Sequence, residues 1–166
     1  MMLTSLADQL YTAMEEERLL AEELHGYGLQ KKDALVAVNT SVVDELTKKE
    51  HRILMTLGSA GTIRMRLTSK LGGMVGLATP SVSEIAQKLG EPHSTRLRSS
   101  ADRLKGVLTE LAKITKTNQV LTKESIGFIK TFFGLLGSNS QENVGYSKPG
   151  YSTPSAPGRL MIDEVV

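Results

Sequence analysis

The 166-residue sequence predicts an all-α protein, an elongated, antiparallel, coiled-coil-like bundle of about three helices followed by a disordered C-terminal tail. Apolar residues recur in rows seven residues apart over three long stretches, the pattern of helices that pack side by side. Aromatic residues make up only 4% of the chain, whereas β-sheets favour aromatic and β-branched side chains. Serine, glycine and proline gather after the last apolar row. We therefore expect a helical bundle over residues 1–137 and a flexible tail over residues 138–166.

The first helix is predicted over about residues 3–24. Two apolar rows offset by three residues form one continuous stripe on this helix, interrupted only by Glu17. Gly26 and Gly28 follow the stripe, and glycine destabilises a helix interior. We expect a kink or a short break near these two glycines.

The second helix is predicted over about residues 33–71, with Asp33 as its N-cap. Several glycines weaken the far end of this segment, and residues 72–80 are expected to form a loop that ends in a Thr-Pro pair. Ser81 and Glu84 then have the spacing of a capping box, which predicts a short helix. That helix should end at Gly90, because glycine and the proline that follows both oppose its continuation.

The longest helix is predicted over residues 94–136, about 43 residues or roughly 65 Å. Its two apolar rows become polar midway, at positions Thr115, Asn118, Thr122 and Ser125. Neighbouring apolar positions such as Ile114 take over the packing in one interpretation, and a buried asparagine sets the helix register in a second. In a third interpretation, this stretch faces a groove that a partner fills.

Charge is unevenly distributed along the chain, although the formal net charge is only +2. Residues 1–63 hold 6 basic and 10 acidic side chains, whereas residues 64–137 hold 12 basic and 5 acidic ones. Oppositely charged helices that lie against each other explain this pattern in one interpretation. In the other, the basic half presents a face to nucleic acid or to an acidic partner.

Several classes of function find no support in the sequence. The absence of cysteine excludes disulfides and thiolate chemistry, and three scattered histidines do not predict a metal site. No phosphate-binding or catalytic motif is present, so we expect no enzyme activity, no catalytic residue, no cofactor and no small-molecule substrate. The sequence shows neither a signal peptide nor an apolar run long enough to span a membrane, which predicts a cytoplasmic protein.

Residues 81–103 support an alternative function as a helix-turn-helix regulator that binds DNA. A short helix precedes a turn and a second helix, and Arg96, Arg98 and Arg103 could contact phosphates. The second helix is far longer than a recognition helix, and neither a third helix nor a wing is evident. Nucleic acid is therefore not the partner that we expect.

Five stretches together resemble a known family. The first helix has a leucine-rich start followed by acidic residues (6–17), and the second has a charged stretch midway (48–52). The long helix contributes two runs (115–121 and 125–129), and the tail has the pattern Tyr-x-x-x-Gly (146–150). A spacer and the run at residues 160–163 complete the tail. This pattern is similar to that of the FlgN family, although Thr115 stands where the family has its first asparagine.

The resemblance implies a cytosolic chaperone for flagellar type III export. Such a chaperone binds the C-terminal helical segments of the hook–filament junction proteins and prevents their premature assembly. It then delivers them to the export gate, a membrane protein that works with an export ATPase complex. The apolar end of the long helix is our candidate client-binding surface, with ordinary bundle core as the alternative: Ile126, Ile129, Phe132, Phe133 and Leu136.

The tail is our candidate recognition segment. We expect Tyr146 and Tyr151 to contact the export gate, because tyrosine offers apolar area and a hydroxyl at low entropic cost. Gly150 completes the tyrosine–glycine pattern that the resemblance implies. Alternatively, the tail folds back over the client groove through its apolar end, made of Leu160, Met161 and Ile162.

Overall fold

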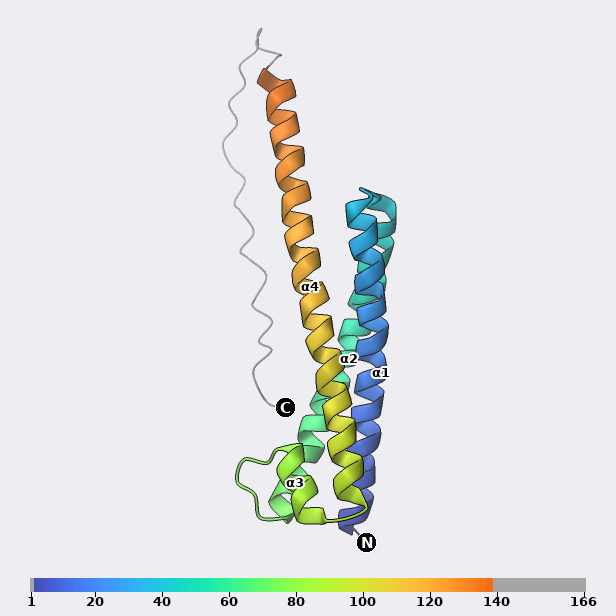
Figure 1. Ribbon diagram of the computed structural model, residues 1–166, viewed down its shortest axis with the longest axis vertical. Coiled ribbons are helices and arrows are strands. Elements are labelled where there is room, and N and C mark those ends of the chain that lie inside the picture. Colours follow the sequence, from blue (N-terminus) through green and yellow to red (C-terminus); the bar gives the residue numbers. More distant parts are fainter. Residues whose placement is uncertain (1, 139–166) are drawn as a thin grey trace.

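The computed structural model describes residues 2–138, apart from the side chains of residues 132 and 135–138, and confirms the all-α class. Four helices follow one another in the described chain (Figure 1): α1 (Met2–Val36), α2 (Thr40–Met74), α3 (Val82–Leu89) and α4 (His93–Ser138). The three long helices form an elongated bundle, and the short α3 lies at the end where the N-terminus is found. The predicted tail lies outside the described residues, apart from its first residue, Ser138, which ends α4.

Helix α1 is the central element, because it packs against both α2 and α4. Helices α1 and α2 run antiparallel, as predicted, with Glu17 paired to Arg64 and Lys31 paired to Glu50. Helix α4 instead runs parallel to α1, since α2 returns the chain to the end where α1 begins, and α3 and its loops turn it there (Figure 1). The backbones of α2 and α4 stay farther apart than those of the other long-helix pairs, although side chains of both helices enter the same core clusters, and α3 lies against both of them at one end.

The predicted break near Gly26 and Gly28 is wrong, because α1 continues through both to Val36. Gly28 lies in the contact between α1 and α4, where a Cβ atom would come within 3.0 Å of Ile114 Cγ2. Gly26 has no neighbouring atom within 4 Å of such a position. The packing of α4 on Gly28 therefore offsets the low helix propensity that predicted the break.

The predicted N-cap at Asp33 is also wrong, because Asp33 lies in the last turns of α1. Asn39 caps α2 instead, and its side chain accepts a hydrogen bond from the backbone N–H of Val42 at 3.2 Å. The capping box is confirmed, with Ser81 and Glu84 each bonded to the other's backbone N–H. Helix α3 ends before Gly90, which has a positive φ of 70°.

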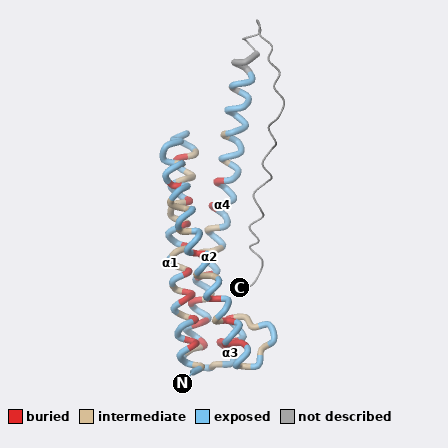
Figure 2. Tube along the Cα trace, turned by 180° about the vertical axis from the view of Figure 1, so that it is seen from behind, coloured by how far each residue is buried: buried red, intermediate tan, exposed pale blue. Residues whose placement is uncertain are grey.

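The main hydrophobic core lies at the α3 end of the bundle, where four helices meet. Figure 2 shows how buried residues gather there and thin out toward the far end of α4. This core unites residues from all four helices: Leu6, Ala7, Leu10, Met14, Leu71, Val82, Ile85, Ala86, Leu97 and Leu104. A second, smaller cluster of Ala21, Leu24 and Leu57 lies farther along α1 and α2.

Glu17, the polar interruption of the first stripe, is buried between α1 and α2. Its carboxylate accepts a hydrogen bond from Arg64 Nε at 2.6 Å, and Gly61 leaves room for it, because a Cβ there would lie 3.2 Å from Glu17 Oε1. A buried charge is tolerated when it is paired in this way. The pair therefore explains why one position of an otherwise apolar stripe is acidic.

Candidate functional site

The polar stretch midway along α4 marks where that helix leaves the bundle. Asn118 is buried, and its Nδ2 donates a hydrogen bond to the Gly28 carbonyl oxygen at 2.8 Å. Ile114 is buried while Thr115 is exposed, so the neighbouring apolar position takes over the packing, as one interpretation predicted. The Asn118 contact agrees with the second interpretation, in which a buried asparagine sets the register between helices.

We call residues 119–138 of α4 the distal segment. Where burial is described, none of these residues is buried, and Leu121 and Ser125 are only half-buried. Apolar side chains are nonetheless frequent here, with 48% exposure at both Ile126 and Ile129. Figure 1 shows the distal segment extending past the turn that joins α1 to α2. The segment is therefore a helix with apolar residues but little bundle around it.

The predicted client-binding residues fall within the distal segment. Ile126, Ile129 and Phe133 are exposed, with Phe133 at 66%, so they lie outside the bundle core. Phe132 and Leu136 belong to the same helix, but their side chains are outside the described part. The six predicted tail residues lie beyond the described residues: Tyr146, Gly150, Tyr151, Leu160, Met161 and Ile162.

The start of α4 joins α1 through ion pairs, which bears on the DNA-binding alternative. Arg96 Nη1 pairs with Asp8 Oδ1 at 2.9 Å, and its guanidinium lies 3.8 Å from the centre of the Tyr11 ring. Arg103 pairs with Glu15 Oε1, also at 2.9 Å. Two of the three arginines expected to meet phosphates are thus engaged within the bundle. These pairs agree with the interpretation in which oppositely charged helices lie against each other.

Glu15 is the most connected carboxylate of this contact. The Ser100 hydroxyl donates to Glu15 Oε1 at 2.6 Å and lowers the pKa of the carboxyl below its ordinary value. Hydrogen bonding to Arg18 and the charge of Arg103 act in the same direction, against the opposing effect of burial. Glu15 is therefore held in its charged form, in which it links α1 to α4.

Other kinds of site receive no support from the described residues. No group of three or more His, Asp or Glu side chains there is arranged to hold a metal ion. Among the helices of the described chain, none combines the length and hydropathy that crossing a membrane requires.

A family model for the FlgN protein matches residues 1–154. The chain belongs to the FlgN family. The comparisons with curated proteins and with solved structures return no match. FlgN-family membership makes this protein a flagellar export chaperone, from a family of chaperones rather than enzymes, which interacts with flagellar export substrates.

Sequence reasoning missed two features of this FlgN-family surface. Val120 and Phe128 are also exposed apolar residues of the distal segment, but neither belongs to the heptad rows from which the surface was predicted. The second feature is a line of lysines on α4, Lys116, Lys123 and Lys130, whose regular spacing of seven residues can be read directly from the sequence. The charge summed over residues 64–137 does not show on which side of the helix the basic residues lie.

Proposed function

We propose that this chain binds the C-terminal helical segments of hook–filament junction proteins along the distal segment of α4. Binding there prevents premature assembly of the clients in the cytoplasm, and the complex then docks at the export gate and its ATPase complex. The observation that carries the proposal is the exposure of Ile126 and Ile129 on a helix that has left its own bundle.

The chemistry of a client helix fits this surface. An amphipathic helix exposes an apolar stripe in water and self-associates through it unless another apolar surface covers that stripe. Ile126 and Ile129 are three residues apart and therefore neighbours on one side of α4, with Phe133 one turn beyond. A client helix laid along this side buries its own stripe and that of the chaperone together.

Co-elution tests the proposal. The full-length chain is expressed with the C-terminal segment of its host's hook–filament junction protein and run by size exclusion at high salt. We expect one stable complex, and we expect the double variant Ile126→Ala/Ile129→Ala to weaken binding about tenfold or more, because two buried contacts are lost. Leu54→Ala/Met55→Ala is the matched control, since both residues are exposed and apolar but lie on α2.

The outcomes separate a binding surface from ordinary core. If the Ile126/Ile129 variant unfolds while the control stays folded, these residues belong to the core and the proposed surface is wrong. If the wild-type chain and the client elute apart, both being folded and soluble, the proposed client is wrong.

The tail supplies the second step of the proposal. Tyr146 and Tyr151 contact the export gate, and Gly150 lies between them in the sequence. A Tyr146→Ala chain that binds client and still docks normally at the gate would remove this role. The alternative, in which Leu160, Met161 and Ile162 cover the client surface, requires that replacing all three by serine tightens client binding.

A further inference from the structure

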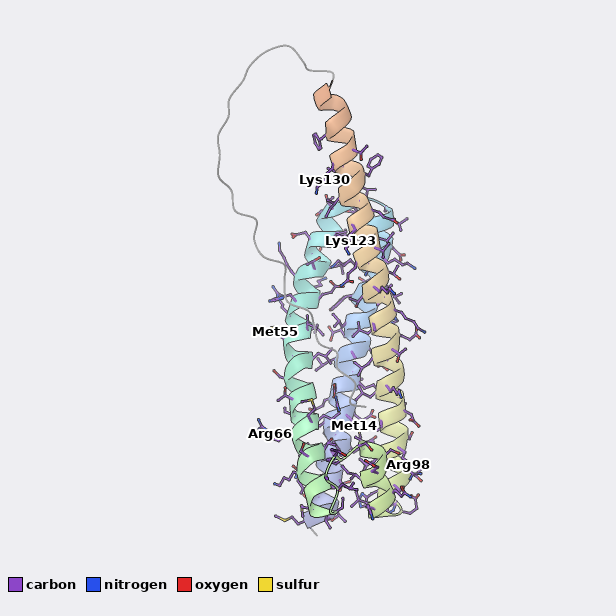
Figure 3. The ribbon with its side chains drawn as sticks, turned by 90° about the vertical axis from the view of Figure 1, so that its left-hand side faces the viewer. Met14, Met55, Arg66, Arg98, Lys123 and Lys130 are labelled. Carbon is purple, nitrogen blue, oxygen red and sulfur yellow. The ribbon has the colours of Figure 1, made fainter. Side chains whose placement is uncertain are left out.

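Five basic residues lie in one line along α4, and we call them the basic stripe: Arg98, Lys105, Lys116, Lys123 and Lys130. Successive members are 7, 11, 7 and 7 residues apart, close to two or three whole turns of an α-helix. All five therefore project from the same side of α4 over roughly 48 Å. Figure 3 labels Arg98 near the α3 end and Lys123 and Lys130 on the distal segment.

The basic stripe is exposed, and none of its members forms an ion pair within the described chain. The other basic residues of α4 from Arg96 to Lys113 are paired, Arg96 and Arg103 with α1 and Lys113 with Glu110 on α4 itself. Asp102 lies one turn from two members of the stripe, yet it pairs with neither. Charge pairing inside the bundle therefore does not account for the stripe.

Apolar residues alternate with lysines along the distal part of the stripe. Val120 lies between Lys116 and Lys123, and Ile126 lies between Lys123 and Lys130, each at a spacing of three or four residues. Val120 and Ile126 are 47% and 48% exposed. Val120 and Ile126 therefore flank the lysines on opposite sides, about 120° apart around α4, and Ile126 is the one that joins the lysines to the apolar side of Ile129 and Phe133.

We infer that the client segment held by the distal segment is an acidic amphipathic helix, whose carboxylates face Lys116, Lys123 and Lys130 while its apolar residues meet Ile126 and the apolar side of α4 beyond it. This inference rests on the proposed function and states the chemical class of its client. Lysines repeat about every 10.5 Å along α4, so an acidic residue in each heptad of an adjacent helix stays in register with them.

Two other partners fit the same residues less well. A helix that lies in an anionic membrane surface keeps its apolar residues on one face and its cations on the other, whereas here exposed apolar residues flank the line of cations on both sides. Nucleic acid would use the lysines as phosphate contacts, but valine and isoleucine between them offer no aromatic ring for a base to stack on.

Charge reversal tests the inference. The triple variant Lys116→Glu/Lys123→Glu/Lys130→Glu is compared with Arg52→Glu/Arg66→Glu/Lys70→Glu, in which three exposed α2 residues change charge by the same amount. Arg66 is labelled in Figure 3 on α2, away from the stripe. Both full-length variants are checked for folding by circular dichroism. Binding of the junction-protein C-terminal segment is then followed by stopped-flow fluorescence at several ionic strengths.

We expect the stripe variant to lower the association rate constant at least about tenfold at low ionic strength, because charges at the edge of a contact steer association. The α2 variant should change it less than about twofold. High salt should reduce the difference in association rate constant between the two variants, because it screens the charges. Replacing the client's acidic residues with lysine should restore fast association to the stripe variant.

The possible contrary results distinguish failure of this inference from failure of the proposed function. Equal behaviour of the two variants, or a natural client segment without acidic residues in successive heptads, overturns the inference and leaves the proposed function standing. Loss of binding to phosphatidylglycerol–phosphatidylethanolamine vesicles by the stripe variant, with client association unchanged, overturns it in favour of a membrane surface. A wild-type chain that does not bind the client overturns the proposed function, and this inference with it.

Discussion

The two ends of α4 have similar sequence patterns but opposite surroundings. At the α3 end, Leu97 and Leu104 are 1% exposed, because α1 and α3 pack against them. In the distal segment, Ile126 and Ile129 are about half exposed. The difference shows that a heptad row predicts a helix with an apolar face, whereas only the presence of neighbouring helices makes that face a core.

Replacing one apolar residue at each end of α4 with alanine should give the largest difference in the free energy of unfolding. Leu104→Ala should lower the free energy of unfolding by about 2–5 kcal/mol, because it leaves a cavity in the main core. Ile126→Ala should change it by less than about 0.5 kcal/mol, because the side chain is exposed. Urea denaturation followed by circular dichroism measures both values, and similar losses would mean that the distal segment is packed like the core.

The boundary between the two regions can be tested at the two α1 glycines. Gly26→Ala should raise the free energy of unfolding by about 0.5–1 kcal/mol, because alanine favours helix and nothing lies nearby. Gly28→Ala should raise the free energy of unfolding by less, or lower it, since its Cβ would lie 3.0 Å from the Ile114 side chain. Thermal unfolding of the two variants compares them directly, and an equal gain at both sites would show that α4 does not approach α1 closely there.

The smallest expected effect is a pH dependence of the α1–α4 contact at Glu15. Its pKa is lowered in the folded chain, so its contribution to stability is present above the ordinary carboxyl pKa and is lost as the pH falls through the lower, folded value. The stability difference between the wild type and Glu15→Gln should therefore shrink from neutral pH to about pH 3. Urea titrations across that range measure it, and a constant difference would contradict the assigned contact.

Much of the fold could be predicted from local pattern. The start and end of α3 follow from Ser81, Glu84 and Gly90, because capping boxes and positive-φ glycines act over a few residues. A register contact at Asn118 is one of three interpretations that the polar stretch leaves open, and its partner, the Gly28 carbonyl 90 residues away, cannot be identified from periodicity. For the candidate site, the apolar pattern predicts Ile126, Ile129 and Phe133 of the distal segment, but not Val120, Phe128 or the basic stripe beside them.

The sequence by itself determined the all-α class, the caps of α3 and membership in the FlgN family, because helix propensity, capping and motif spacing are properties of short stretches. Only the tertiary structure decided that α1 continues through Gly28, that Arg96 and Arg103 pair with α1, and that the distal segment leaves the bundle. These outcomes depend on which helices lie side by side, and packing between distant segments outweighs the small free-energy preferences of single residues.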